Sequence, residues 1–322
     1  MHRTMTPDHL EPATRPALYF IGVTTGSSSI RGVFPRWAEV LGLGDVELVG
    51  IDVAVHAPAE QYRAVVQFMR QDPLSCGALV TTHKMDLYAA CADVFDEVDP
   101  LAELMNEVSC LAVEGGRVRA SAKDPWTSGL ALQAFVPPGH WEGNDREVLV
   151  LGAGGSAVAM DWHLCRTERG ADRPAAVTVT DLVAPRLELL RSVHEHVAPN
   201  VPLRTRAGVS AEQTDELLAA LPAGSLVVNA TGLGKDAPGS PAGARATFPH
   251  QGLVWELNYR GDLVFLRQAR AQQAERELVV EDGWTYFLHG WTRVIAEVFQ
   301  IDIPTSGPVF DRLSDIAAGT RS

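Results

Sequence analysis

An apolar run that leads directly into a glycine-rich turn constrains the fold of this chain more than any other feature. Residues 148–151 are a strand-like VLVL, Gly152-Ala153-Gly154-Gly155-Ser156-Ala157 follow at once, and a helix-compatible segment, 158–165, comes next. In such a unit Gly152 permits the tight turn, Gly154 lets the backbone approach a pyrophosphate, and Ala157 allows close helix–strand packing. The free N–H groups at the helix start suit an anion. We therefore predict a dinucleotide-binding turn rather than a plain strand–helix connection.

An acidic residue follows the next strand-like run, as a dinucleotide site requires. Asp181 ends VTVTD, 181 − 152 = 29 residues after Gly152. A carboxylate there accepts hydrogen bonds from the ribose 2′-hydroxyl and repels a 2′-phosphate, which favours NAD. The usual separation is ~20 residues, and the polar insert 167–174 explains the excess. Asp181 could also cap the following helix, and the nearby Arg186 keeps NADP open as the cofactor.

A second small-residue loop follows the strand-like SLVV. It contains Asn229-Ala230-Thr231, which also matches the N-x-T glycosylation pattern. Glycosylation needs an export signal, and the polar, proline-bearing residues 1–16 carry no apolar signal core. We therefore predict that this loop lies at a sheet edge against the cofactor, and we expect a cytoplasmic protein.

Length and charge restrict the remaining function classes. The chain has 322 residues, which suggests about two domains. Its net charge of −13 argues against nucleic acid and against an anionic membrane surface as partners. No apolar run is long enough to span a bilayer. The four cysteines match no metal or redox spacing and are expected to be small buried side chains. His194 and His196 lie in what looks like a solvated helix end, so no metal site is predicted.

The first third of the chain alternates strand-like and helix-like segments, which predicts an α/β fold with a mainly parallel sheet. ALYFIGV, VELVGIDV and GALVTTH are apolar runs that end in turn or polar residues. Between them, a helical period places four apolar side chains on one face: Tyr62, Val65, Val66 and Met69. Near the C-terminus, Trp291, Val294, Ile295 and Val298 recur at the same helical spacing.

Two charged side chains at strand ends are candidates for acid–base chemistry. Lys84 follows the buried run GALVTTH, and Asp124 follows another strand in RASAKDPW. A lysine beside a carboxylate suits alcohol–ketone interconversion, because the lysine can give a proton to the oxygen or take one from it while the carboxylate orients it. Taken singly, each residue is more often a surface charge than a catalyst.

In order along residues 19–299, these motifs resemble those of the shikimate/quinate dehydrogenase family. VTTHK is similar to the family's lysine motif, although it lacks the proline and is one residue shorter. SAKDPWTSG resembles its Asn-Thr-Asp-Gly motif, and LMNEVS its Gly-Ala-x-Asn segment. GAGGSA, NATGLG and ELNY resemble its cofactor loop, its nicotinamide-side loop and its tyrosine segment. The resemblance implies that Lys84 and Asp124 are catalytic and that Ser28, Asn106 and Tyr259 bind substrate.

The resemblance also implies a domain plan. We expect an α/β substrate domain over residues 17–125, a Rossmann domain over 126–283 that binds NAD or NADP, and C-terminal helices, 284–322, that pack back on the first domain. Residues 1–16 are expected to be a flexible tail. A homodimer is compatible with this plan, and the expected partner is a small-molecule substrate.

Several positions depart from the family pattern on the substrate side. In GVTTGSSSIRG, Ser28 matches the first family serine and Ile30 replaces the second. A shift by one residue would offer Ser27 and Ser29 instead, with Arg31 supplying charge for a carboxylate. Ala122, beside Lys123, replaces the family's second asparagine. Gly290 stands where a glutamine is expected, with His289 and Tyr286 close by.

These departures predict a changed substrate rather than a lost fold, because a site built to bond each hydroxyl discriminates strongly between substrates. The favoured function is an NAD(P)-dependent dehydrogenase acting on a shikimate- or quinate-like cyclic polyol acid. Two alternatives stay open: an enzyme similar to methylene-tetrahydrofolate dehydrogenases, and a non-catalytic sensor that binds a ligand or NAD.

Overall fold

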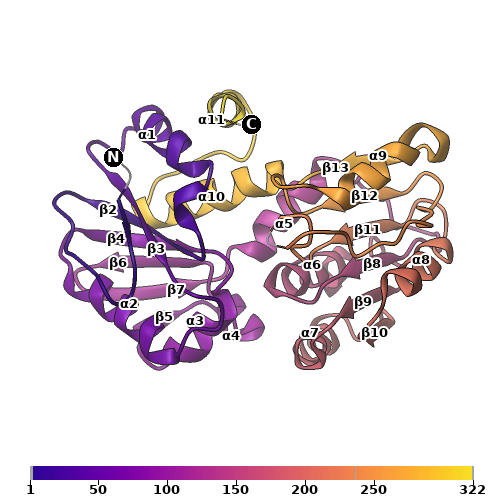
Figure 1. Cartoon of the computed structure of the whole chain (residues 1–322), viewed down its shortest axis with the longest axis horizontal. Coiled ribbons are helices and arrows are strands. Elements are labelled where there is room, and N and C mark those ends of the chain that lie inside the picture. Colours follow the sequence, from indigo (N-terminus) through magenta and orange to yellow (C-terminus); the bar gives the residue numbers. More distant parts are fainter. Residues whose placement is uncertain (1–2, 236, 321–322) are drawn as a thin grey trace. The chain divides into compact units, whose positions relative to one another are not determined.

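The computed structural model describes residues 3–235 and 237–320, and the chain forms two compact units (Figure 1). Unit 1 comprises residues 1–123 and 288–322, and unit 2 comprises residues 124–287. Residues 1–2 of the expected tail and 321–322 of the C-terminal segment lie outside the described part. The predicted α/β class, with a Rossmann-like second unit, is confirmed. Among the described residues, no helix is both long and apolar enough to cross a membrane.

Unit 1 is built on a seven-stranded sheet with the order β1-β3-β2-β4-β6-β7-β5. Its strands are β1 (Thr4–Met5), β2 (Ala17–Gly22), β3 (Glu47–Asp52), β4 (Ser75–Val80), β5 (Glu97–Val98), β6 (Cys110–Glu114) and β7 (Arg117–Ser121). Its helices are α1 (Ile30–Leu41), α2 (Ala59–Gln71), α3 (Lys84–Cys91), α4 (Pro100–Met105) and α11 (Pro308–Ala318), with a 3-10 turn, η1 (Thr25–Ser27). Neighbouring strands are parallel except that β6 runs antiparallel to β4 and β7. Gly115 and Gly116, both with positive φ, form the tight turn between β6 and β7.

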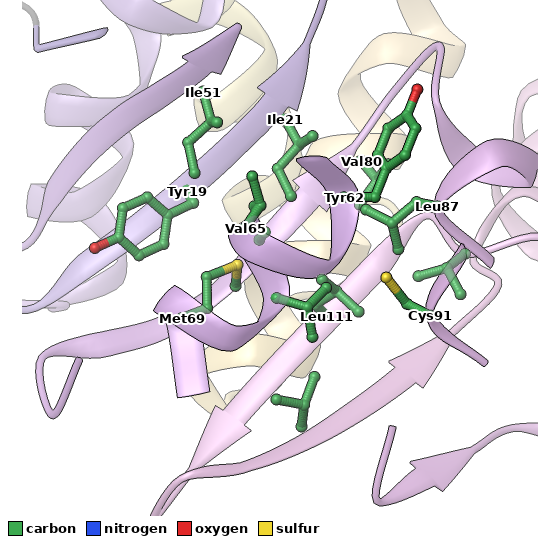
Figure 2. Close-up of a cluster of buried hydrophobic side chains, with 14 of the residues drawn as sticks. Tyr19, Ile21, Ile51, Tyr62, Val65, Met69, Val80, Leu87, Cys91 and Leu111 are labelled. Atoms are coloured by element: carbon green, nitrogen blue, oxygen red, sulfur yellow. The ribbon is translucent and has the colours of Figure 1, made fainter. Parts of the chain in front are cut away.

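The core of unit 1 is the layer between this sheet and its helices (Figure 2). The predicted apolar face of α2 is confirmed, because all four of its side chains are buried. They pack with Tyr19, Ile21 and Val80 of the central strands. The strands predicted from three apolar runs are likewise present as β2, β3 and β4. Parallel strands buried in this way explain why those runs are almost continuously apolar.

The N-terminal segment corrects one expectation. Residues 3–16 are not a free tail: β1 pairs in parallel with β3, and Met5 is only 5% exposed in the core. Arg31 of α1 donates to the carbonyl of Arg3 at 2.9 Å and to Thr4 Oγ1 at 2.9 Å. No periodic pattern marks this segment, because a two-residue strand is too short to show one.

Most of α10 (Trp284–Phe299), from Leu288 onward, and all of α11 belong to unit 1. Trp291 packs edge-on against Phe20 with ring centroids 5.0 Å apart, and Val298 lies where a side chain at Gly77 would otherwise stand. Trp37 Nε1 of α1 donates to the carbonyl of Leu313 at 2.8 Å. Gly77 therefore permits the close approach of α10 to β4.

Unit 2 has a fully parallel six-stranded sheet with the order β10-β9-β8-β11-β12-β13. Its strands are β8 (Val148–Leu151), β9 (Val177–Asp181), β10 (Leu203–Ala207), β11 (Leu226–Asn229), β12 (Leu253–Glu256) and β13 (Val279–Glu281). Its helices are α5 (Asp124–Gln133), α6 (Gly155–Cys165), α7 (Ala184–Val197), α8 (Ala211–Ala219), α9 (Val264–Arg276) and the start of α10, with a 3-10 turn, η2 (Thr167–Arg169). Numbered within the unit, this order is 3-2-1-4-5-6, the Rossmann order.

Candidate active site

The glycine-rich turn lies at the point of unit 2 where the strand order reverses. It leaves β8, whose neighbours are β9 on one side and β11 on the other. Gly152 has φ +102°, and a Cβ added there would stand 2.7 Å from the carbonyl oxygen of Ala230. A Cβ on Gly154, in contrast, would meet nothing within 4 Å. The turn is therefore closed against the Asn229 loop and open above Gly154, where α6 begins.

Asp181 holds this turn from the neighbouring strand. Its Oδ2 accepts the N–H of Ala153 at 2.7 Å, and its Oδ1 accepts the N–H of Val183 at 2.7 Å. Val183 is the N-cap of α7, so Asp181 also orders the approach to that helix. Each carboxylate oxygen retains further acceptor capacity, because it has more than one lone pair.

Sequence reasoning missed a buried carboxylate, Glu256, at the end of β12. Its Oε2 accepts from Asn229 Nδ2 at 2.7 Å, and its Oε1 accepts from both nitrogens of Asn258, at 2.9 and 2.7 Å. Asn229 in turn accepts from Thr231 through Oδ1. Burial raises the pKa of Glu256 to about 7, although these hydrogen bonds oppose the shift. The network fixes the Asn229 loop beside the glycine-rich turn, and ELNY was singled out only for its tyrosine.

Asp124 is the first residue of α5 and is 5% exposed. Ser156, the second residue of α6, donates to Asp124 Oδ2 at 3.4 Å, and the hydroxyl of Tyr286 donates to Ser156 Oγ at 3.2 Å. The predicted catalytic aspartate therefore contacts the predicted cofactor turn directly. A side chain on Gly129 would collide with the His163 imidazole, so this glycine permits α5 and α6 to pack closely.

Lys84 and Asn106 come together in unit 1, at the carboxyl edge of β4. Lys84 is the first residue of α3, and its carbonyl accepts the N–H of Val108 at 3.1 Å. Asn106 ends α4 in the left-handed region, with φ +50°, and its side chain is exposed. Lys123, which precedes Asp124 in the chain, donates its N–H to Ser109 Oγ at 2.7 Å. The segments that carry Lys84, Asn106 and Lys123 thus meet at one edge of the sheet of unit 1.

The serine segment after β2 settles one of the open alternatives. Ser28 is 7% exposed at the end of η1, while Ser27 is exposed and Ser29 is half-buried. Arg31 is 4% exposed, and its guanidinium donates to the carbonyls of Thr25 and Leu48 as well as to the N-terminal segment. Burial lowers the pKa of Arg31, with the Asp52 carboxylate opposing. The alternative that Arg31 binds a substrate carboxylate is therefore wrong, because its donors are committed to the fold.

The remaining predicted substrate residues lie along the segment from β12 to α10. Tyr259 is half-buried and packs against Trp284 and Phe287 at 5.3 and 4.8 Å between ring centroids. His289 is 4% exposed and stacks on Phe310 at 4.7 Å, and burial lowers its pKa to about 4. A Cβ on Gly290 would meet nothing within 4 Å. Tyr286 and His289 were noted as lying close to Gly290 in the sequence. The Tyr286 hydroxyl donates to Ser156, and His289 is packed in unit 1.

One histidine expectation is wrong, and it bears on metal binding. His194 is 2% exposed rather than solvated; its Nδ1 bonds Asp161 at 2.9 Å and its Nε2 bonds the carbonyl of Val201 at 2.7 Å. Burial alone would lower the pKa of His194, but Asp161 raises it overall. With Cys165, these side chains form a buried group, within the described residues, whose atoms could hold a metal ion. The hydrogen bonds among these side chains also give the group a structural role, because they link α6 to α7.

Comparisons with known proteins give concordant matches. A shikimate dehydrogenase (NADP(+)) of Methylocella silvestris is 27% identical over 279 residues, which cover 86% of this chain and 88% of that protein. One of Symbiobacterium thermophilum is 29% identical over 197 residues, which cover 60% of this chain and 61% of that protein. This second match therefore spans less than two thirds of its relative. No protein-family model matches the chain.

Solved structures share the whole fold. Shikimate 5-dehydrogenase of Thermus thermophilus, in complex with NADP(H) and shikimate, aligns with TM-score 0.67 and 22% identity over 94% of this chain and 99% of that one. Quinate dehydrogenase of Corynebacterium glutamicum, in complex with NAD, aligns with TM-score 0.66 and 19% identity over 95% and 99%. The resemblance predicted from the motifs is confirmed, with this chain as a divergent relative.

Proposed function

We propose that this divergent relative of the shikimate and quinate dehydrogenases is an NAD(P)-dependent oxidoreductase that acts on CH–OH groups. Its substrate is a shikimate- or quinate-like cyclic polyol acid, in which a ring hydroxyl and a ketone are interconverted. The observation that carries this proposal is the contact between Ser156 of the glycine-rich turn and the buried Asp124. A dinucleotide turn bonded to a carboxylate suits hydride chemistry coupled to proton transfer.

The residues of the turn fit a dinucleotide. The open space above Gly154 admits a pyrophosphate close to the backbone, and the N-terminus of α6 offers N–H groups to it. The residues that would hold the cofactor are Gly152, Ala153, Gly154, Gly155, Ser156, Ala157, Asp181, Asn229, Ala230 and Thr231. When bound, the nicotinamide ring supplies or accepts the hydride.

Lys84 and Asp124 divide the proton chemistry in this proposal. Both residues begin a helix, where the positive end of the helix dipole favours a carboxylate and disfavours an ammonium. Lys84 gives a proton to the substrate oxygen during reduction and takes it during oxidation, while Asp124 orients the lysine and the substrate hydroxyl.

Substrate binding falls to Ser28, Asn106 and Tyr259 in this proposal, with a pocket that differs from the family pattern. The open space at Gly290 and the burial of His289 leave fewer donors there than a glutamine would supply. Because an unpaired hydroxyl in a polar pocket costs affinity, the preferred substrate should carry a different hydroxyl pattern from shikimate.

We further propose NAD as the preferred cofactor. Asp181 is the last residue of β9, at the edge where the ribose of a dinucleotide lies in this fold. Its charge attracts the ribose 2′-hydroxyl and repels a 2′-phosphate. The curated relatives carry NADP(+) in their names, so a preference for NAD would be a specific feature of this chain.

The test is dinucleotide absorbance with the purified protein and a panel of quinate, shikimate, aminoshikimate and cyclitols, each with NAD and with NADP. We expect turnover with at least one cyclic acid and a higher kcat/KM with NAD. Lys84→Ala should lower kcat by about 10²–10⁴-fold with near-normal dinucleotide affinity, measured by tryptophan fluorescence. An unchanged rate in Lys84→Ala would remove Lys84 from the mechanism. Tight ligand binding without turnover would favour the sensor, and a preference for folates the other enzyme class.

A further inference from the structure

A chain of hydroxyl groups runs from the start of α10 to the buried carboxylate of Asp124. Tyr286 donates to Ser156 Oγ at 3.2 Å, and Ser156 donates to Asp124 Oδ2 at 3.4 Å. The three side chains come from three helices of unit 2, each from within its first turn: α10, α6 and α5. Tyr286 also packs its ring against Trp255, with centroids 5.7 Å apart.

The direction of these hydrogen bonds determines how the two hydroxyl groups act on the carboxylate of Asp124. A serine hydroxyl has one proton to donate, and Ser156 directs it to Asp124. Accepting a hydrogen bond from Tyr286 polarises that hydroxyl and makes it a stronger donor. Hydrogen bonds to an ionised acceptor are also stronger than neutral ones. Oδ2 of Asp124 is thereby held in one direction, and rotation of the carboxylate is restricted.

The position of Ser156 connects this carboxylate to the cofactor turn. Its backbone lies in the first turn of α6, directly after the open space at Gly154, while its side chain reaches α5. A movement of the turn when a dinucleotide binds would therefore be transmitted to Asp124 through a single side chain.

We propose that Ser156 and Tyr286 are positioning residues that hold Asp124 in its reactive orientation and link that orientation to the dinucleotide turn. This inference rests on the proposed function, because it assigns the chain of hydroxyls a role in that reaction. In this proposal Tyr286 acts on Asp124 through Ser156.

Kinetics of single and double variants test the inference. Ser156→Ala and Tyr286→Phe should each lower kcat, by about tenfold for the first and less for the second. The KM for the dinucleotide should stay within about twofold, because both variants keep the backbone N–H groups that α6 offers to the pyrophosphate. Tyr286→Phe should add nothing in the Ser156→Ala background, because the two residues act in series. Ser156→Thr, which keeps the hydroxyl, should recover most of the rate. Asp124→Asn gives the reference for complete loss.

Ser128→Ala is the matched control. Ser128 lies one turn after Asp124 on α5, is fully buried, and donates to the carbonyl of Pro125 in its own helix. We expect its kcat to equal that of the parent. A loss of the same size in this variant would make the effect of Ser156→Ala a general packing effect and overturn the inference.

Other outcomes are equally decisive. Additive losses from Ser156→Ala and Tyr286→Phe, or a change in KM alone, would overturn the positioning role while the parent enzyme remains active. A parent without turnover on the whole panel would refute the proposed function and the inference with it. In that case a urea-unfolding cycle on Ser156→Ala and Tyr286→Phe separates the two failures: non-additive midpoints would show that the hydrogen bonds exist without a catalytic role.

Discussion

The two units repeat one device and then use it differently. In each unit an aspartate ends a strand and accepts hydrogen bonds from the loop that follows the neighbouring parallel strand. Asp52 of β3 accepts from the N–H and the hydroxyl of Thr25, at 2.8 and 2.6 Å, in the loop after β2. Asp181 of β9 accepts from the N–H of Ala153 in the loop after β8. Both loops lead into a helix at the carboxyl edge of a sheet, where ligands bind in such folds.

The difference lies in how each loop is held to its sheet. In unit 1 the buried guanidinium of Arg31 donates to the carbonyl and the hydroxyl of Thr25, and a side chain on Gly50 of β3 would collide with both Arg31 and Thr25. In unit 2 nothing stands within 4 Å of a Cβ at Gly154. The same strand–helix–strand arrangement is therefore anchored by an arginine in unit 1, whereas Asp181 holds the loop of unit 2 and no protein atom stands over Gly154.

The largest expected effect concerns the loop after β2, which Arg31 anchors in unit 1. Arg31→Met should lower the free energy of unfolding of unit 1 by about 3 kcal/mol, because buried carbonyls of Arg3, Thr25 and Leu48 lose their donors and Asp52 loses a nearby positive charge. Urea unfolding measures it. Arg36→Met, on the exposed side of the same helix, should change stability by less than about 0.5 kcal/mol. If Arg31→Met instead raised KM without loss of stability, the arginine would be a substrate ligand after all.

This comparison also shows which features a sequence discloses. The strand, the turn and the helix around Gly152 were predicted in the right order because they are contiguous and each glycine has a local steric reason, although α6 begins at Gly155 rather than at Val158. The structural role of Arg31, which the sequence offered only as an alternative carboxylate ligand, was not predicted. Its partners, at residues 3, 4, 25 and 48, come from separate segments that only folding brings together. Tyr286 and Ser156 are 130 positions apart, so no local pattern could pair them.

Burial decides the other differences from expectation. His194 lies among polar residues in the sequence, and only the packing of α7 on α6 places it beside Asp161. Glu256 was passed over because a charged residue at a strand end is normally solvated, whereas here two asparagines satisfy it. Apolar periodicity, in contrast, is a direct record of burial, and the predicted faces of α2 and α10 are buried as expected.

The second-largest expected effect concerns the glycine-rich loop after β8 in unit 2. Gly154→Ala should weaken the binding of NAD and NADP alike by about tenfold or more, because the new methyl group enters the space proposed for the pyrophosphate. Its stability should remain within about 0.5 kcal/mol of the parent, since Gly154 has φ −75°, a conformation that alanine adopts freely. Gly152→Ala should instead destabilise unit 2 by about 1–3 kcal/mol, given its positive φ. Titrations of tryptophan fluorescence give the affinities, and unchanged affinity in Gly154→Ala would show that this space is not the anion site.

The smallest effect separates the two aspartates. Asp181→Asn keeps the shape of the side chain and an acceptor for Ala153, but it removes the charge and the acceptor for Val183. The ratio of kcat/KM with NAD to that with NADP should therefore fall by about tenfold. The gain comes from NADP, whose 2′-phosphate no longer faces a carboxylate, while NAD loses only the stronger part of one hydrogen bond. Asp52→Asn, the same change in unit 1, should leave this ratio unchanged because Asp52 accepts from Thr25 rather than from a dinucleotide. Equal changes with both cofactors in Asp181→Asn would mean that Asp181 only orders the loop, and the two aspartates would then serve the same structural purpose.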